Sequence, residues 1–437
     1  MKKSVFHNSF ITFIRQVLSI VFGLLASIII ARSLGSEGQG QYTLAILLPT
    51  LLYTLLNSGI SSSTVYFIGK DEFTIQEVYS TNLFTALLLS IISILVGAFI
   101  ILFFRDYFFR DISIQLLFYS LLLLPLIYLQ KNLQTIFQGK EEFKKYNFII
   151  LLNQFGLLFF SFVFLYFLKL GILGAILSFG CSQLIMLITS FYYLYQSYKL
   201  SWPQKYSVKY LKQVFIFGLK GHLSNILSFI NYRVDMFLIA YYIDDISVGI
   251  YSVAVLLVER VWIVSESVST VLYARVANIK SNMERNKFTS LAARNTIFIS
   301  ILVGILISFF ANLIIVKFFG DDFKQSVIPF ILMIPGIVIF TMSKVLANDF
   351  VGRGKPEINT YIASITAITN IILNFILIPY YGIKGAACAT TISYILDALL
   401  KSTYFSIKNK IPFREFYVIK IIDFKLYKNG ILNYLKK

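Results

Sequence analysis

Two stretches of this chain, half its length apart, resemble each other. Residues 31–48 read ARSLGSEGQGQYTLAILL and residues 240–257 read AYYIDDISVGIYSVAVLL, so that Gly40 matches Gly249 and Tyr42 matches Tyr251 at an offset of 209 residues. A second echo, at an offset of 211, pairs GILGA at 171–175 with GIKGA at 382–386. A few matching small residues also arise by chance in apolar sequences. Self-similarity at half-length is nevertheless typical of secondary transporters, which pair two related helical bundles around a central site.

The composition predicts an all-α, polytopic membrane protein. The chain is 57% hydrophobic and only 14% charged, whereas soluble domains carry about 25% charged residues. Apolar runs near the ~20 residues that span a bilayer recur along it. The first run is too long for a signal peptide and no small-residue cleavage site comes after it, so we expect a retained span. Cys181 and Cys388 lie inside apolar runs, which argues against disulfides or a metal cluster.

Charge distribution predicts topology. We expect twelve spans, near residues 11–33, 42–66, 83–104, 114–136, 148–168, 172–195, 213–242, 247–274, 295–316, 327–348, 358–378 and 385–405. The termini and alternate loops on one side then hold 25 of the 39 Lys and Arg residues, against seven on the other side. By the positive-inside rule both termini are cytoplasmic. The net charge of +18 is therefore mostly a topology signal, and we expect no nucleic-acid partner.

The span count also predicts the domain organisation. Six spans per half give both halves the same orientation, so the repeats should be parallel. Residues 196–212 form a basic connector at the midpoint. We therefore expect a six-helix lobe at 1–200, a second at 201–405 around a central cavity, and a basic cytoplasmic tail at 406–437, either an interfacial helix or a topological anchor.

Polar residues align along four predicted spans, where they are costly and usually face a bundle interior or a wet cavity. At 100° per residue each set falls on one helix face. The aligned residues are Asn8, Thr12, Arg15 and Ser19 in span 1; Thr50, Thr54, Asn57 and Ser61 in span 2; Lys220, Ser224, Ser228, Asn231 and Asp235 in span 7; and Ser252, Glu259, Glu266 and Thr270, with Arg260 at the edge, in span 8.

Spans 1 and 2 correspond to spans 7 and 8 in the repeat, so the four stripes belong to two related helix pairs. We expect them to line a central hydrated cavity; the alternative is that each stripe pairs with a neighbouring helix in a packed bundle. Arg233 lies on a second face of span 7. Outside these spans, Asp397 and Lys401 should form a local ion pair, and Lys344 should extend to the membrane interface.

Signals for catalysis are weak, and we expect no enzyme and no cofactor. The two histidines have no zinc-binding spacing, and residues 352–355 (GRGK) are too short for a phosphate-binding loop. No aspartates have DxD spacing, and the longest connector, about 20 residues at 275–294, offers little room for a glycosyltransferase or polymerase site.

The segment Ala31–Tyr42, with RSLG followed by GxGxY, resembles the first loop of the Wzx-type polysaccharide-biosynthesis flippases of the multidrug/oligosaccharidyl-lipid/polysaccharide exporter superfamily. Arg233-x-Asp235 followed by Gly249-x-Tyr251, and the Gly-Lys pairs at 139–140 and 354–355, are similar to the same family. The resemblance implies transport of undecaprenyl-pyrophosphate-linked oligosaccharides across the bacterial inner membrane by alternating access, for O-antigen or capsule. It also makes a glycan polymerase and a chain-length regulator candidate partners.

That resemblance gives the intramembrane charges roles. Arginine binds phosphate oxygens bidentately and keeps its proton, so Arg15 and Arg233, then Arg260 and Lys220, are expected to bind the pyrophosphate. Hydroxyl and amide groups, Asn57 and Asn231 among them, would contact the sugars. The carboxylates Asp235, Glu259 and Glu266 would balance the charge or bind a coupling proton or sodium ion.

Two other classes stay open. A cation-coupled multidrug exporter of the same superfamily would be expected to have acidic residues in its cavity, so the arginines argue against it. A membrane glycosyltransferase or polymerase would be expected to carry a long outer loop, which the predicted spans leave out.

Overall fold

The computed structural model describes residues 2–200, 202–203, 205–279, 281–420 and 423, and these residues are helical almost throughout, with no strand among them. This confirms the predicted all-α membrane fold. The chain divides into two compact units. The first contains residues 1–229, 236–252 and 318–323, and the second contains residues 230–235, 253–317 and 324–437. The predicted lobe boundaries at residues 200 and 405 stay a prediction.

Helices of the first unit come from the N-terminal half of the chain. They are α1 (Lys2–Leu56), α2 (Ile60–Gly69), α3 (Ile75–Phe108), α4 (Ile114–Leu121), α5 (Leu124–Gly139), α6 (Phe143–Ser161), which continues as a π-helical turn (Phe162–Phe167), and α7 (Gly171–Tyr198). Most of α8 (Val208–Tyr242) and the first half of α9 (Asp245–Val258) also belong to it.

The second unit also consists mostly of long helices, and two short turns among its elements contribute residues 318–323 to the first unit. Its elements are a 3-10 turn (Glu259–Val261), α10 (Trp262–Asn278), α11 (Asn282–Phe309), α12 (Ala311–Ile314), a π-helical turn (Ile315–Phe319), a 3-10 turn (Asp321–Ser326), α13 (Val327–Gly352), α14 (Glu357–Tyr381), α15 (Ile383–Asn409) and α16 (Arg414–Tyr417). Apolar side chains from α10, α11, α13, α14, α15 and α16 form a buried cluster within it.

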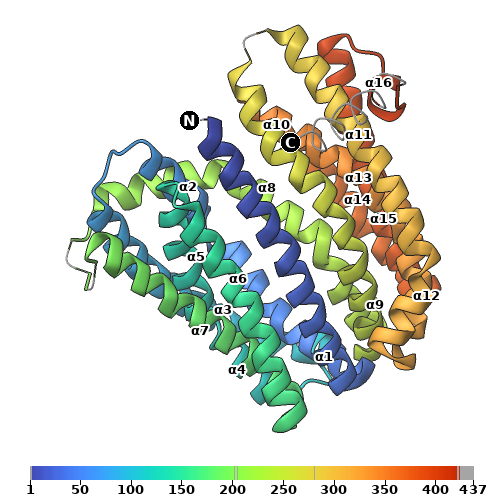
Figure 1. The fold of residues 1–437 in the computed structure, drawn as a ribbon. Coiled ribbons are helices and arrows are strands. Elements are labelled where there is room, and N and C mark those ends of the chain that lie inside the picture. Colours follow the sequence, from blue (N-terminus) through green and yellow to red (C-terminus); the bar gives the residue numbers. More distant parts are fainter. Residues whose placement is uncertain (1, 201, 204, 280, 421–422, 424–437) are drawn as a thin grey trace. The chain divides into compact units, whose positions relative to one another are not determined.

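Ten helical segments within the described residues are long and apolar enough to cross a membrane. One of them, in α1, accounts for two of the twelve predicted spans. At 1.5 Å per residue the 55 residues of α1 would reach ~80 Å, far beyond a ~30 Å hydrocarbon core. The helix breaks at Gly35 (φ 68°), and Figure 1 shows its two limbs in dark and lighter blue meeting at this bend. Helix α8, with the polar stripe of predicted span 7, is not among the ten.

The sequence repeat corresponds to a repeat in backbone geometry. Helix α7 begins at Gly171 and α15 follows Gly382, and both glycines have a φ of 58°, in the left-handed region that favours glycine. The two helices have 28 and 27 residues, and each ends at a lysine in the left-handed conformation, Lys199 and Lys410. The lysines are 211 positions apart, the same offset as the glycines. The second echo in the sequence therefore marks equivalent helix starts.

The glycines of the first echo lie against each other within the first unit. A Cβ atom on Gly40 would lie 1.8 Å from the carbonyl oxygen of Asp245, and one on Gly249 would lie 1.9 Å from that of Ser36. No side chain fits at either position, because the obstruction is backbone. Small residues at such crossings let two membrane helices approach closely. The matched glycines thus permit close packing of α1 against α9.

The segments after α7 and α15 are also alike, because each packs against an earlier helix of its own half of the chain. The connector after α7 lies on α3: Ser207 N donates to Thr81 Oγ1 at 3.0 Å. The tail after α15 lies on α11, where Arg294 donates to both carboxylate oxygens of Asp423 at 2.6 and 2.8 Å. Both ends of the second pair are buried. Of the predicted tail, residues 424–437 lie outside the described residues.

Candidate functional site

An arginine of α8 meets opposite charge inside the second unit. Arg233 donates from Nη1 and Nη2 to the two carboxylate oxygens of Glu259, at 2.7 and 3.1 Å. Glu259 opens the 3-10 turn between α9 and α10, so the turn places its side chain beside α8. Such a bidentate contact between an arginine and a carboxylate is among the strong charge-assisted hydrogen bonds. The charge of Arg233 is therefore already balanced in this structure.

Asp235 lies two residues further along α8 and is 2% exposed. Thr390 of α15 donates to its Oδ2 at 3.2 Å. A carboxylate at this depth is costly and is usually functional in a membrane protein. Asn231, one turn earlier, is 4% exposed, and its side-chain oxygen accepts no hydrogen bond from the described residues. These two side chains give α8 a buried polar face within the second unit.

A second ion pair lies between α13 and α15. Lys401 contacts Asp397 at 2.7 Å, which confirms the pairing predicted from their spacing. Ser343 of α13 joins them: it accepts from Lys401 at 3.0 Å and donates to Asp397. All three side chains are buried. The carboxylate and the ammonium are thus held by both a helical neighbour and a hydroxyl from another helix.

Four aromatic rings surround these charges and form what we term the aromatic cluster: Tyr232, Trp262, Phe340 and Tyr394. Phe340 and Tyr394 stack with centroids 4.5 Å apart, and Tyr232 lies 5.3 Å from Trp262. Lys344 lies 3.8 Å above the indole of Trp262 and 3.7 Å from Glu266. A ring and a carboxylate thus contact its ammonium within the second unit. The expected position of Lys344 at the membrane interface stays a prediction.

Arg260 differs from the other cations of the second unit. It comes directly after Glu259 in the 3-10 turn, is half-buried, and lies within ion-pair distance of no carboxylate among the described residues. Its Nε is buried and donates to no described group. Glu259 and Glu266 act on it only through longer-range attraction. This guanidinium retains hydrogen-bonding capacity for a ligand.

The predicted site residues are divided between the two units. Arg15 and Asn57 belong to the first, where half-buried Arg15 interacts electrostatically with Tyr146 of α6 and the side-chain oxygen of Asn57 is buried without a described hydrogen-bond partner. The side chain of Lys220 lies outside the described residues. The others belong to the second unit: Arg233, Arg260, Asn231, Asp235, Glu259 and Glu266.

Sequence reasoning missed the aromatic cluster and Ser343, and the only available signal was Tyr232 beside Arg233. Within the described part of the chain, no group of three or more His, Cys, Asp or Glu side chains could hold a metal ion. The four cations Arg233, Arg260, Lys344 and Lys401 equal in number the carboxylates Asp235, Glu259, Glu266 and Asp397. The site therefore combines balanced charges with hydroxyls and aromatic faces, which suits a ligand that carries both anionic and hydroxyl groups.

Comparison with known families decides the class. The sequence model of the family described as polysaccharide biosynthesis protein matches residues 5–277, more than half of the chain. The chain belongs to this family. This confirms the resemblance found in the sequence and makes the chain a multi-pass membrane member of the family. A second family model, MatE, matches residues 222–376, which include most of the charged site.

Two curated relatives of this family member align along most of its length. A Shigella flexneri protein named "Putative O-antigen transporter" is 25% identical over 390 residues, 85% of this chain and 90% of the relative. The Staphylococcus aureus capsular polysaccharide biosynthesis protein CapF is 22% identical and covers 90% of this chain and 97% of its own length. Among solved structures, the lipid II flippase MurJ in an inward closed conformation has a TM-score of 0.77 at 19% identity, over 96% of this chain and 92% of MurJ. That likeness concerns the fold.

Proposed function

We propose that this protein translocates an undecaprenyl-pyrophosphate-linked oligosaccharide from the cytoplasmic to the outer leaflet of a bacterial cytoplasmic membrane, for O-antigen or capsule synthesis. The names of its full-length relatives support a glycan cargo. The observation that carries the proposal is Arg260, a guanidinium within a predicted span that is not neutralised by a close carboxylate among the described residues. A pyrophosphate crossing hydrocarbon requires such a cation, and a planar guanidinium binds it bidentately.

Arg233 has a conditional role in this proposal. In this structure both terminal nitrogens of its guanidinium group donate to Glu259. An incoming pyrophosphate would compete with Glu259 for Arg233, and the released carboxylate could then accept a coupling cation. Asp235, held by Thr390, is the second candidate for the coupling proton or sodium ion. The proposed mechanism is alternating access with both termini cytoplasmic, consistent with the asymmetry of Lys and Arg along the chain.

Complementation of a flippase-null strain tests the proposal. Arg260→Ala should abolish restoration of the surface glycan while the protein still inserts, whereas Lys324→Ala, which removes an exposed cation of the same unit, should restore it fully. Full glycan restoration by Arg260→Ala at a normal membrane level would overturn the assignment of the phosphate contact.

The Arg233–Glu259 pair allows a sharper experiment. If the pair is only structural, Arg233→Ala should be inactive because Glu259 is left unpaired, and the double variant Arg233→Ala/Glu259→Ala should recover export. If Arg233 binds the pyrophosphate, the double variant should stay inactive although its stability recovers. The comparison of stability with export separates the two roles.

A cation-coupled drug exporter is the second candidate, because the MatE model matches residues 222–376. Accumulation of a fluorescent cationic drug in cells that express the chain tests it. Asp235-dependent efflux, without restoration of the glycan, would favour this function over glycan transport.

A further inference from the structure

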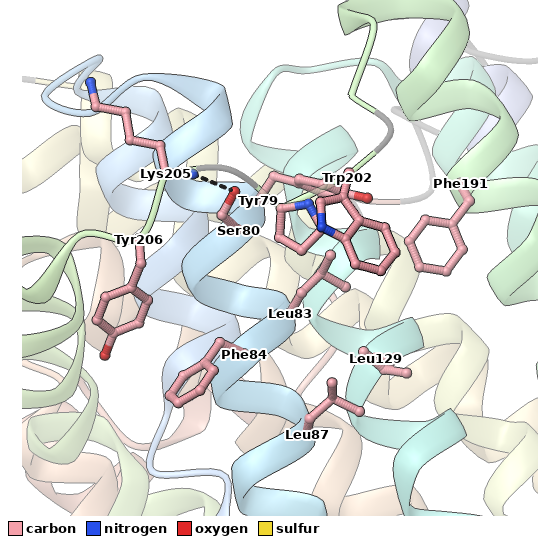
Figure 2. Close-up of a pocket in the computed structure, with 11 residues that line it drawn as sticks. Tyr79, Ser80, Leu83, Phe84, Leu87, Leu129, Phe191, Trp202, Lys205 and Tyr206 are labelled. Atoms are coloured by element: carbon pink, nitrogen blue, oxygen red, sulfur yellow. Dashed lines mark hydrogen bonds between the residues drawn. The ribbon is translucent and has the colours of Figure 1, made fainter.

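A cavity of about 680 Å³ lies in the first unit, outside the charged site, between α3, α5, α7 and the connector to α8. Its size falls within the ~300–1,000 Å³ of ligand pockets. Its walls are mostly apolar, and Figure 2 shows Trp202, Phe191, Leu83, Leu87 and Leu129 around it. The proposed glycan transport does not use it, since none of the candidate site residues lines it.

The cavity continues into an exposed apolar surface. Its wall on α3 includes Phe84 and Leu87, which are exposed, and the exposed side chains Ile91 and Leu95 continue the same face at helical spacing. In a membrane helix an exposed apolar stripe of this kind contacts acyl chains. A chain that lies along α3 can therefore enter the cavity without crossing a polar barrier.

The connector that borders the cavity is rich in lysine. The connector and its flanks, residues 196–212, carry Lys199, Lys205, Lys209 and Lys212 and no acidic residue, and all four lysines are exposed. Lys205 pairs with Glu77 of α3 at 3.3 Å, and Figure 2 shows its side chain directed away from the cavity. The other three have no acidic partner among the described residues. By the predicted topology this connector is cytoplasmic, where the membrane surface is anionic.

Hydrogen bonds hold the connector over the cavity. Lys205 N donates to Ser80 Oγ at 3.4 Å, and Gln76 Nε2 donates to the carbonyl oxygen of Trp202 at 3.3 Å. Trp202 is 74% exposed although it lines the cavity, and tryptophan is enriched at membrane interfaces. The result is an apolar pocket closed on one side by a basic, hydrogen-bonded strap.

We propose that this cavity binds one acyl chain of an anionic phospholipid of the cytoplasmic leaflet, with its phosphate at the connector lysines. An apolar pocket beneath exposed cations matches a ligand that has an apolar chain and an anionic headgroup. The bound lipid would bridge α3 and the connector, and so stabilise the segment that joins the two halves of the chain. This site does not depend on the identity of the transported molecule.

The two tryptophans, Trp202 and Trp262, make the proposal measurable. In the Trp262→Phe protein, Trp202 is the only tryptophan, and phospholipids with brominated acyl chains quench its fluorescence on contact. In nanodiscs, brominated phosphatidylglycerol should quench more than brominated phosphatidylcholine at equal mole fraction. Equal quenching by the two lipids would overturn the anionic preference.

Two variants in this background locate the site. Leu129→Phe fills the cavity and should reduce quenching, whereas Leu95→Phe adds the same bulk to the exposed face of α3 and should leave it unchanged; equal effects would assign the quenching to bulk lipid and overturn the cavity. Replacing Lys199, Lys209 and Lys212 by Gln should lower the relative affinity for phosphatidylglycerol about fivefold per lysine that contacts the headgroup, at ~1 kcal/mol each.

A competition distinguishes the two sources of anionic lipid. Undecaprenyl phosphate, added at low mole fraction, should not relieve the quenching by brominated phosphatidylglycerol. Complete relief would show that the cavity takes a polyprenyl chain instead, and would overturn the phospholipid assignment.

Discussion

Helices α7 and α15 occupy equivalent positions in the repeat, yet they handle polar groups differently. Both start at a glycine with a φ of 58° and end at a left-handed lysine. In α7, Ser178 and Ser190 donate to carbonyl oxygens of their own helix. In α15, Thr390 donates to α8 and Lys401 donates to α13. These two hydroxyls of α7 are thus satisfied within their own helix, while Thr390 and Lys401 of α15 bond to other helices.

The residues at the matched positions explain this contrast. At the offset of 211, Asp397 and Lys401 of α15 correspond to Met186 and Ser190 of α7. The backbone is repeated while the charges are placed in one copy only. Duplication thus preserved the helix ends, whose geometry the fold needs, and left the interior positions free to diverge. The second unit therefore has an ion pair in a helix whose ends have the same backbone geometry as their counterparts in the first unit.

The largest effect is expected from making α15 resemble α7. Lys401→Ser alone should lower the stability of the protein by about 3–5 kcal/mol, because it leaves the carboxylate of Asp397 buried without its cation. The double variant Asp397→Met/Lys401→Ser, which installs the residues of α7, should recover most of this loss. Thermal unfolding in detergent measures both. A double variant as unstable as Lys401→Ser would show that α15 requires the ion pair and cannot replace it with the residues of α7.

The second largest effect concerns the tail after α15. Arg294 donates to Asp423 and lowers the pKa of this carboxyl group below its ordinary value of about 3.9. Because the folded-state pKa is lowered, the pair contributes fully above about pH 4 and is lost as the pH falls through the folded-state pKa. Asp423→Asn should weaken the docking of the tail by about 1.5–3 kcal/mol at pH 7.

Hydrogen exchange at α16 measures this docking. Exchange there should rise in Asp423→Asn at pH 7, and in the wild type on acidification after correction for the intrinsic rate. The connector after α7, where Ser207 donates to Thr81 of α3, provides the internal control for Asp423→Asn at pH 7 and should not change. It carries the Lys205–Glu77 ion pair, so it is no control for the acidification. If exchange at α16 did not change on acidification, the Arg294–Asp423 ion pair would not be what holds the tail on α11.

The glycine contact tests the close packing of α1 against α9. Gly40→Ala or Gly249→Ala should each cost about 1–3 kcal/mol, because the added methyl group meets a backbone carbonyl at under 2 Å. Gly69→Ala, whose Cβ would meet nothing within 4 Å, is the matched control. If both contact variants unfold at the wild-type temperature, the two helices can separate without loss.

The smallest effect tests the equivalence of the helix starts. Gly171→Ala and Gly382→Ala should each cost about 1–2 kcal/mol, since alanine is strained at a φ of 58°. Equal shifts in unfolding temperature would support a shared frame. A cost at only one of the two positions would show that the two starts are not energetically equivalent.

Much of the fold could be read from the sequence because membrane helices are specified by long apolar runs. The Asp397–Lys401 pair was also predictable, because a spacing of four residues places both side chains on one face of their own helix. The Arg233–Glu259 pair was not, because the two residues are 26 positions apart, with the end of α8 and all of α9 between them. The contacts of Lys344 were not predictable either, since its partners Trp262 and Glu266 come from another helix.

The sequence by itself determined the helical membrane fold, the charge asymmetry and the duplicated positions, because each depends on local composition or on spacing along one chain. Only the tertiary structure decided which charges are neutralised, since that depends on contacts between helices far apart in the sequence. It placed Glu259 on Arg233, Ser343 between Asp397 and Lys401, and no close carboxylate on Arg260 among the described residues. Packing inside the second unit therefore distinguishes the arginine that retains binding capacity from the one that is already paired.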